Sequence, residues 1–234
     1  MLTPSGPKML PLRALRQLQN AFQTELCTRR FQRRWGFAPP PPWSDSVGYE
    51  SLLEEIERHK VDRLDGDVLE IGALLGGGTA KLCGWFARHS ADKRVLAIDV
   101  FDPDFDPTTT VQGWTMGELY AHLIGDRNQR ELFDEVTRGC ANLTVVAGDS
   151  TSVDIPTDHL AFAFVDGSHV PADVLSDFER VWERLVPGGV AAFHDYGGDL
   201  PGVTHTLHSC IGRHAEEIAR IWTRQPTLLF VQRS

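Results

Sequence analysis

Residues 68–79 read VLEIGALLGGGT, an apolar run that leads into a glycine-rich turn. The run predicts a buried strand, and the glycines predict a tight turn that opens a helix. Glycine lets a ligand approach the main chain where a Cβ atom would block it, so we expect this turn to cradle a nucleotide. After Gly72 the next glycine is Gly76, which does not match the G-x-G-x-x-G spacing of dinucleotide-binding turns. A pyrophosphate ligand is therefore disfavoured.

A second apolar run, residues 94–99, follows the predicted helix and ends in Asp99. This composition predicts a second strand with a carboxylate at its tip. A carboxylate in that place can accept hydrogen bonds from both hydroxyls of a ribose. The order of strand, glycine turn, helix, strand and acid therefore indicates an adenosine cofactor.

This order resembles the class I S-adenosylmethionine-dependent methyltransferases. Residues 68–79 are similar to motif I of that family, in which an acid, one residue and a glycine precede a variable run, a second glycine and a Ser or Thr. The resemblance implies that Glu70, Gly72, Gly76 and Thr79 form the loop around the methionine part of S-adenosyl-L-methionine. It also implies that the carboxylate at the tip of the second strand binds the ribose.

Length and charge limit the class of the protein and its partners. The chain has 234 residues, which suits one well-buried α/β domain with an appendage, and a formal net charge of −9. Nucleic acid and anionic membranes both attract clustered positive charge, so no nucleic-acid partner is expected. No apolar run approaches the roughly 20 residues of a membrane helix, and no signal-peptide pattern is present. We therefore expect no membrane insertion and a cytoplasmic protein.

Residues 1–43 are predicted to form an N-terminal helical extension with a proline-rich spacer. Within 10–32, apolar residues recur at helical spacing at Leu12, Leu15, Leu18, Phe22 and Leu26. This stripe needs a partner surface, either the cofactor domain or a second copy of the chain, and a homodimer is preferred. Residues 44–46 are expected to cap a second helix that runs to about residue 59. Residues 44–234 are expected to form the methyltransferase domain.

The remaining chain alternates between strand and helix patterns. Strands are predicted at 68–72, 95–100, 143–147, 160–165 and 190–193, with a closing hairpin at 217–223 and 227–232. Helices are predicted at 79–89, about 116–139 and 173–186, the last capped by Gly188 and Gly189. The turn-rich segment 101–118 is expected to be a lid, the alternative being a disordered surface loop. We expect an α/β, doubly wound, Rossmann-like methyltransferase fold with a mainly parallel seven-stranded sheet and an antiparallel last strand.

Polar residues follow two of these strands at the point where each strand ends. Asp166 and His169 follow one strand, and His194 and Asp195 follow another. Because the carboxyl ends of parallel strands meet at one edge of a sheet, we expect these four side chains to converge beside the cofactor. Carboxylate oxygens with room for water and a substrate hydroxyl suit a Mg²⁺ ion.

The segments DGSH (166–169) and HDY (194–196), joined by a helix and Pro-Gly-Gly, resemble the metal-dependent small-molecule O-methyltransferases of the macrocin and rhamnosyl type. The resemblance implies that Asp166, His194 and Asp195 hold a divalent ion, with Asp166 also bordering the cofactor. The ion is expected to be Mg²⁺ or Mn²⁺. An imidazole fits Mg²⁺ less well than Mn²⁺ or Fe²⁺, so whether His194 binds the ion is left open.

Two further roles follow from the same resemblance. His169 corresponds in position to the general base of catechol-type enzymes, the alternatives being a histidine that caps the next helix or His194 as the base. Asp149 or Ser150, at the end of the third strand, is implied to contact the adenine; an Asp that caps the next turn is the alternative.

These residues predict an S-adenosylmethionine- and metal-dependent O-methyltransferase. The acceptor is expected to be a small molecule or oligosaccharide, methylated on a hydroxyl of a sugar, glycoside or saccharide-bearing natural product. One alternative is a cephalosporin-hydroxylase-like enzyme of the same fold with different chemistry. Another is a non-catalytic nucleotide-binding assembly protein. The convergence of Asp166 and Asp195 disfavours it, because a scaffold does not need charged residues in one crevice.

Overall fold

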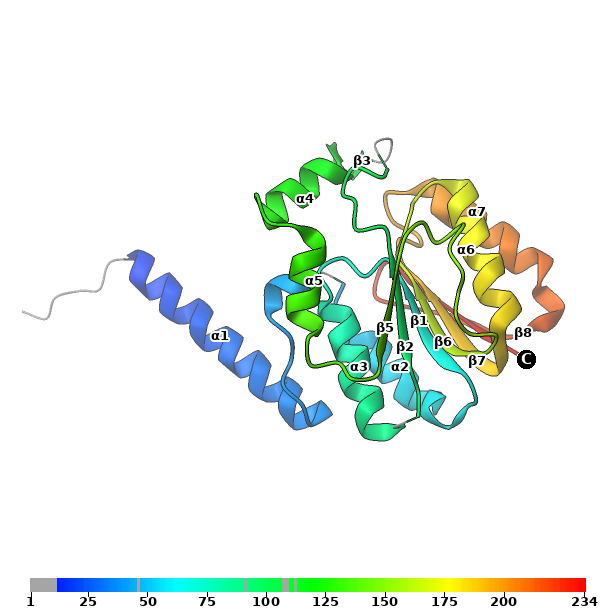
Figure 1. Cartoon of the computed structure of the whole chain (residues 1–234), viewed down its shortest axis with the longest axis horizontal. Helices are drawn as coiled ribbons and strands as arrows, with labels where there is room; N and C mark the ends of the chain where they lie inside the picture. Colours follow the sequence, from blue (N-terminus) through cyan, green and yellow to red (C-terminus); the bar gives the residue numbers. More distant parts are fainter. Residues whose placement is uncertain (1–11, 46, 91, 107–109, 112) are drawn as a thin grey trace, which may run out of the picture.

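The computed structural model describes residues 12–45, 47–90, 92–106, 110–111 and 113–234. Its centre is a seven-stranded sheet in the order β5-β2-β1-β6-β7-β9-β8. The strands are β1 (Asp67–Ile71), β2 (Val95–Asp99), β5 (Leu143–Ala147), β6 (Leu160–Val165), β7 (Leu185–Phe193), β8 (Ile218–Arg224) and β9 (Leu228–Arg233). All pairs from β5 to β7 are parallel, and β9 runs antiparallel to both of its neighbours. The predicted sheet with an antiparallel last strand is confirmed (Figure 1).

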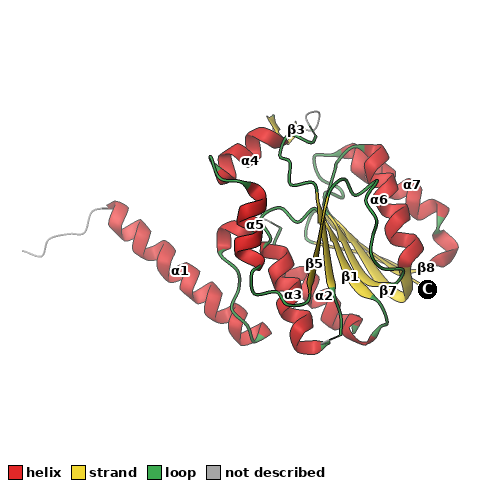
Figure 2. Cartoon of the chain, in the orientation of Figure 1, coloured by secondary structure: helices red, strands yellow, loops and turns green. Residues whose placement is uncertain are grey.

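Helices cover both faces of the sheet, as Figure 2 shows. They are α1 (Leu12–Trp35), α2 (Glu50–Arg58), α3 (Gly77–His89), α4 (Met116–Ile124), α5 (Gln129–Thr137), α6 (Pro171–Arg184) and α7 (Pro201–Arg213). Phe86 of α3 packs with Val68 in the core on one face, together with side chains of α2. Phe178 of α6 packs with Leu69 in the core on the other face, together with side chains of α7. Because neighbouring residues of a strand point to opposite faces, β1 needs apolar residues on both.

The segment between β2 and β5 holds two helices, α4 and α5, where the sequence predicted one at about 116–139. Gly125 ends α4 with φ 59° and ψ −131°, a conformation outside the helical region that glycine adopts readily. Asn128 then caps α5, because its side chain accepts a hydrogen bond from Glu131 N at 3.1 Å. A short hairpin precedes α4, formed by β3 (Thr110–Val111) and β4 (Trp114–Thr115).

The predicted glycine cap of α6 is wrong. α6 ends at Arg184, and the next residue, Leu185, is extended with φ −67° and ψ 124°. Leu185 is buried and pairs with Leu160 of β6, so sheet pairing begins at once. Gly188 and Gly189 consequently lie inside β7.

The predicted cap of α2 is also wrong. α2 begins after Tyr49, and no side chain caps its N-terminus. Ser44 ends a short 3-10 turn, Pro42–Ser44, and Ser46 lies outside the described residues. Asp45 Oδ1 instead accepts hydrogen bonds from the main-chain N–H groups of residues 47 and 48, each at 3.2 Å. Its carboxylate shapes the loop before α2.

The N-terminal helix is present as α1 and reaches Trp35, which is buried together with Phe31. Figure 1 shows the first part of α1 leading away from the sheet. Leu26 is 38% exposed, and the side chains of the remaining stripe residues lie outside the described part of the chain. The homodimer through this helix therefore stays a prediction. Across the described ranges, none of the helices has both the length and the apolar character needed to cross a membrane.

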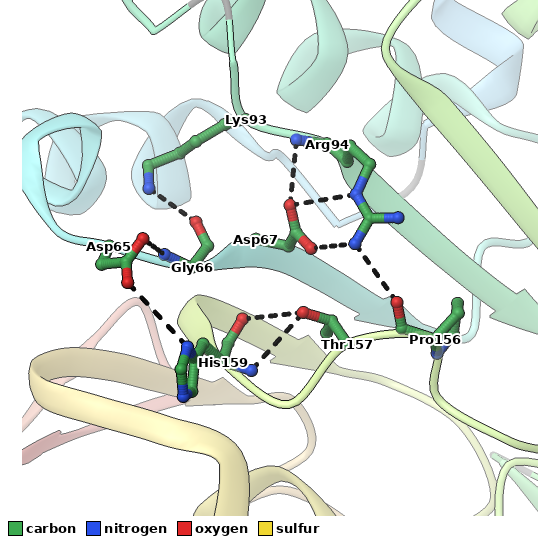
Figure 3. Close-up of polar contacts among 8 residues, drawn as sticks. All are labelled: Asp65, Gly66, Asp67, Lys93, Arg94, Pro156, Thr157 and His159. Carbon is green, nitrogen blue, oxygen red and sulfur yellow. Dashed lines mark hydrogen bonds and ion pairs between the residues drawn. The ribbon is translucent and has the colours of Figure 1, made fainter.

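Polar contacts close the amino ends of β1 and β2, at the edge opposite the glycine turn (Figure 3). Asp67 Oδ2 accepts a hydrogen bond from Arg94 Nη2 at 2.5 Å, and the same guanidinium donates to Pro156 O at 3.2 Å. Burial raises the pKa of Asp67, but the hydrogen bonds from Arg94 outweigh burial and lower it. Lys93 Nζ donates to Gly66 O at 2.7 Å. These contacts hold the amino ends of β1 and β2 to each other and to the segment before β6.

Candidate active site

Strands β1 and β6 present neighbouring residues at the carboxyl edge of the sheet. Their register pairs Ile71 with Val165. Asp166 N donates to Ile71 O at 2.8 Å, and His194 N donates to Val165 O at 3.0 Å, so the two site segments are tied to the strand ends. Gly72 has φ 83°, and a Cβ atom there would lie 1.9 Å from Asp166 O. Only glycine fits at this contact between the first turn and the site.

Four polar side chains converge at this edge, as predicted. His194 Nδ1 lies 3.1 Å from Asp166 Oδ1 and 3.2 Å from Asp195 Oδ1. His169 Nε2 lies 2.8 Å from Asp195 Oδ2. Asp195 has φ 58°, a left-handed conformation that is uncommon outside glycine and is often found at functional sites.

The two histidines and Asp195 shift one another's pKa. Burial lowers the pKa of His194, but its contacts with both carboxylates outweigh burial and raise that pKa to about 10. Burial likewise opposes protonation of His169, yet Asp195 and Asp166 raise its pKa. Burial raises the pKa of Asp195, whereas the two histidines hold it well below its usual range. The carboxylates of Asp166 and Asp195 both lie within 3.2 Å of His194 Nδ1. Positive charge beside them offsets their mutual repulsion.

The donor set fits a divalent ion. Ligand atoms of Asp166, His169 and Asp195 all lie within 4.8 Å of one another. This trio differs from the predicted trio in one member, since His169 stands where His194 was expected. Nδ1 of His194 is buried beside the two carboxylates without forming a hydrogen bond of normal geometry in the described part of the chain. Carboxylate oxygens with imidazole nitrogens suit Mn²⁺ or Fe²⁺, and Mg²⁺ when oxygen ligands dominate.

Two cavities meet at this cluster. One cavity is called the cofactor-side cavity because residues predicted to bind the cofactor line it: Gly72, Asp99, Asp149 and Ser150, together with Phe105 and Gly148. The other is called the acceptor-side cavity, since the acceptor is expected there; it is lined by α4, by His194 and Asp195, and by Ser44, Asp45, Val47 and Tyr49. Both cavities share Gly72, Met116, Tyr120, Asp166, Gly167 and His169. A group passing from a ligand in one cavity to a ligand in the other would pass this shared wall.

Asp99 stands at the tip of β2 as predicted, where it also shapes the glycine turn. It is 8% exposed, and its Oδ2 accepts hydrogen bonds from Ala73 N at 2.8 Å and Leu74 N at 3.0 Å. Its Oδ1 accepts from Phe101 N at 2.7 Å. Burial raises the pKa of Asp99, opposed by these hydrogen bonds. Its contact with a ribose stays a prediction, and its contacts with the turn are an additional role.

Three of the predicted cofactor residues lie outside both cavities. Glu70 is fully buried and accepts hydrogen bonds from Tyr49 Oη at 2.6 Å and from Thr79 Oγ1; burial raises its pKa to about 7. A Cβ atom at Gly76 would lie 2.9 Å from Phe133. The structure therefore gives Glu70, Thr79 and Gly76 packing roles, and their contacts with a cofactor stay predictions.

The glycines at the start of α3 make room for the segment before α2. A Cβ atom at Gly77 would lie 2.3 Å from Ser44 O, and one at Gly78 would lie 1.9 Å from Tyr49 Cζ. Sequence reasoning assigned this run to the cofactor loop. The packing partners precede the run by about thirty residues, so local sequence carries no signal for them.

Asp149 and Ser150 both line the cofactor-side cavity. Asp149 Oδ1 also accepts hydrogen bonds from Thr151 N and Thr151 Oγ1, each at 2.8 Å. The turn-capping alternative is thus present in the structure. Contact with the adenine stays a prediction for both residues.

The mainly parallel seven-stranded sheet with its antiparallel last strand is the fold of the class I methyltransferases. The family described as the methyltransferase domain matches residues 69–196, and the chain belongs to this family. The predicted membership in the class I methyltransferases is confirmed. No curated protein sequence matches the chain.

Solved structures share the fold at low sequence identity. The O-methyltransferase NovP is 18% identical with a TM-score of 0.64, over 79% of this chain and 78% of that one. CalS11, a calicheamicin methyltransferase, is 16% identical with a TM-score of 0.59, over 98% and 99% of the two chains. MycE, from the mycinamycin biosynthetic pathway, is 15% identical with a TM-score of 0.52, over 88% of this chain and 54% of that one. At these identities the likeness establishes the fold.

Proposed function

We propose that this protein transfers a methyl group from S-adenosylmethionine to a hydroxyl of a sugar, glycoside or saccharide-bearing natural product, with a divalent metal ion. The observation that carries the proposal is the meeting of two cavities at Asp166 and His169. Solved neighbours support it: CalS11 is described as a TDP-rhamnose 3'-O-methyltransferase, and MycE was solved with Mg, SAH and mycinamycin VI.

The cofactor-side cavity is proposed to hold S-adenosylmethionine. Gly72 lines this cavity at the turn that follows β1, beside Asp166. Asp99 is proposed to bind the ribose, since it lines the cavity at the tip of β2. Asp149 and Ser150 line the same cavity and are proposed to border the adenine.

Asp166 and Asp195 are proposed to hold the metal ion, Mg²⁺ or Mn²⁺, with His194 as the third protein ligand. His194 Nδ1 faces both carboxylates at 3.1 and 3.2 Å, which supports this assignment. When bound, the ion supplies Lewis acidity that lowers the pKa of the acceptor hydroxyl.

His169 is proposed to be the general base. It lines both cavities, whereas His194 lines only the acceptor-side one of the two. His169 Nε2 contacts Asp195, which favours the tautomer with the proton on Nε2 and a lone pair on Nδ1. His194 presents Nδ1 to the two carboxylates that are proposed to hold the ion, and its Nε2 lies 3.3 Å from Thr227 Oγ1. The acceptor oxygen bonds to the methyl carbon as the carbon–sulfur bond breaks, and its proton passes to His169.

Calorimetry with S-adenosylhomocysteine tests the cofactor half of this proposal. Asp99→Ala should weaken binding by roughly 30-fold to 1,000-fold, because two charge-assisted hydrogen bonds are lost. Asp158→Ala, at an exposed position, is the control and should bind as the wild type does. Unchanged affinity in Asp99→Ala would show that the ribose assignment is wrong.

Transfer of a labelled methyl group from S-adenosylmethionine tests the metal half. Activity on an acceptor panel of sugars and glycosides should disappear with excess chelator and return with Mg²⁺ or Mn²⁺. Full transfer in chelator would remove the metal from the proposal. Tight cofactor binding without transfer to any acceptor would favour a related enzyme with different chemistry.

A further inference from the structure

Two cysteines that are far apart in the sequence line one cavity near the amino ends of β2 and β5. Cys83 lies on α3 and is 1% exposed, and Cys140 lies in the turn between α5 and β5 and is partly buried. The same cavity is lined by Arg94 and Asn142, which directly precede β2 and β5. Neither cysteine lines the cofactor-side or the acceptor-side cavity. The pair is therefore separate from the candidate active site.

The turn that carries Cys140 is held against α3. Helices α3 and α5 pack side by side (Figure 1). Asn142 Nδ2 donates a hydrogen bond to Cys83 O at 3.3 Å, and Cys140 N donates to Thr137 O at 2.9 Å. Cys140 also packs against the buried cluster that includes Cys83. These contacts fix the main chain of both cysteines so that their side chains meet.

The two thiols contact each other directly, and the contact makes them chemically different. The Cys83 thiol forms a hydrogen bond with the sulfur of Cys140; this bond and burial raise the pKa of Cys83 well above its ordinary value. The same hydrogen bond lowers the pKa of Cys140, because it stabilises the thiolate there. A thiolate is the nucleophile in disulfide exchange, so Cys140 is the residue that attacks.

The surroundings of the pair fix the order in which the two sulfurs react. A Cβ atom at Gly139 would meet no atom within 4 Å, so there is space beside Cys140 for an incoming molecule. Cys83 lies beneath it in the core. A reagent therefore reaches Cys140 first, and Cys83 attacks from the protein side once Cys140 has reacted. The other two cysteines lie on different elements, Cys27 on α1 and Cys210 on α7.

We propose that Cys83 and Cys140 form a thiol–disulfide exchange site that reacts with small disulfides such as glutathione disulfide. The Cys140 thiolate attacks one sulfur of the small disulfide, forms a mixed disulfide and releases one thiolate. Cys83 then attacks the Cys140 sulfur, and the bond between Cys83 and Cys140 forms as the second small thiol leaves with the proton of Cys83. Two electrons pass from the protein to the small disulfide, which becomes two thiols.

Mass spectrometry of the full chain tests the proposal. The parent protein carries Cys27→Ser, so that the exposed thiol does not compete. It is reduced, incubated with glutathione disulfide at neutral pH, quenched with acid and alkylated. The folded parent should lose two hydrogen atoms, and a peptide map should show a disulfide between Cys83 and Cys140. Retention of both thiols, or an adduct on Cys140 that never converts to the disulfide, would overturn the proposal.

Further substitutions in this parent assign the two roles. Cys83→Ala should accumulate the glutathione adduct on Cys140 by roughly tenfold or more above the parent, because the resolving thiol is absent. Cys140→Ser should form neither the adduct nor the disulfide. Cys210→Ser, at a second buried cysteine, is the matched control and should form the disulfide as the parent does. A glutathione adduct on Cys83 in folded Cys140→Ser would overturn the proposal.

A time course of the parent gives the same information without a substitution in the core. The adduct on Cys140 should appear before the disulfide and decline as the disulfide forms. An adduct that appears first on Cys83 would overturn the assigned order of attack and the proposal with it.

Discussion

Tyr49 donates its phenolic proton to Glu70 across 2.6 Å, and this contact joins the segment before α2 to the strand that leads into the glycine turn. Both residues are buried, and Thr79 of α3 donates to the second carboxylate oxygen. Glu70, which the sequence predicts to contact the cofactor, therefore holds Tyr49 in place, and Tyr49 lines the acceptor-side cavity. The two halves of the site share one buried hydrogen-bond network.

Removal of the Tyr49 hydroxyl should destabilise the fold. Tyr49→Phe keeps the ring, which packs edge-on against Phe164, but leaves one buried oxygen of Glu70 without its partner. A loss of about 1–3 kcal/mol in the free energy of unfolding is expected in urea titrations. Tyr196→Phe is the control, because its hydroxyl contacts His208 at the surface, and it should cost about 0.5 kcal/mol or less. Equal losses in both variants would contradict the role of the buried contact.

Gly78→Ala should destabilise the protein while leaving cofactor binding intact. A Cβ atom at this helical position would meet the ring of Tyr49, and overpacking of this kind costs about 1–3 kcal/mol. Gly212→Ala in α7 meets no atom within 4 Å and should stabilise the helix by about 0.5–1 kcal/mol. Urea unfolding and calorimetry with S-adenosylhomocysteine measure both effects. A large loss of cofactor affinity in Gly78→Ala would return this glycine to the cofactor loop.

These contacts show where sequence reasoning about the fold succeeds and where it stops. Strands β5 and β6 have the predicted bounds. β6 is buried at every position, as expected for a continuous apolar run, whereas β5 is an edge strand that is only partly buried, although the sequence predicted that it is covered on both faces. The division between α4 and α5 depends on the conformation of Gly125, which a helical pattern of neighbouring residues conceals. The end of α6 depends on the pairing of Leu185 with Leu160, a tertiary contact that overrides the glycines that follow.

The candidate site divides in the same way. The sequence predicted that four side chains converge, because parallel strands bring their carboxyl ends to one edge of the sheet. They are Asp166, His169, His194 and Asp195. Their pairing could not, since spacing along the chain does not tell which imidazole faces which carboxylate.

Asp177 of α6 should make stability depend on pH. It is fully buried, neither of its carboxylate oxygens has a well-formed hydrogen bond within the described residues, and burial raises its pKa to about 7. The native state thus keeps a proton that the unfolded chain releases above its ordinary pKa of about 4. Its contribution to stability is complete below pH 4 and is lost as pH rises to about 7, by roughly 2–4 kcal/mol.

Asp177→Asn should remove this dependence, because the amide stays neutral at every pH. Urea unfolding at pH 4.5, 5.5 and 7 measures the stability of the variant relative to the wild type, which should increase steadily as pH rises because only the wild type loses stability. Asp158→Asn, at an exposed position, is the matched control and should follow the wild type. A parallel pH profile for Asp177→Asn and the wild type would show that the buried carboxyl does not retain its proton.

Titration with Mn²⁺, followed by electron paramagnetic resonance, should show which of the two histidines binds the metal ion. Asp166→Asn and Asp195→Asn should each abolish tight binding. Both carboxylates are ligands whether His194 or His169 is the third ligand. His194→Ala should weaken binding by about 10-fold to 100-fold. His169→Ala should bind Mn²⁺ within a few-fold of the wild type.

His169→Ala should nevertheless lower methyl transfer to the acceptor that the wild type uses by about 10²-fold to 10⁴-fold, because a general base acts in the transition state. S-adenosylhomocysteine affinity should stay unchanged in this variant. The roles of the two histidines can also be exchanged, with His169 as the metal ligand. Ligand atoms of His169, Asp166 and Asp195 lie within 4.8 Å of one another. If His169→Ala loses Mn²⁺ while His194→Ala retains it and is inactive, His169 is the ligand and His194 is the base.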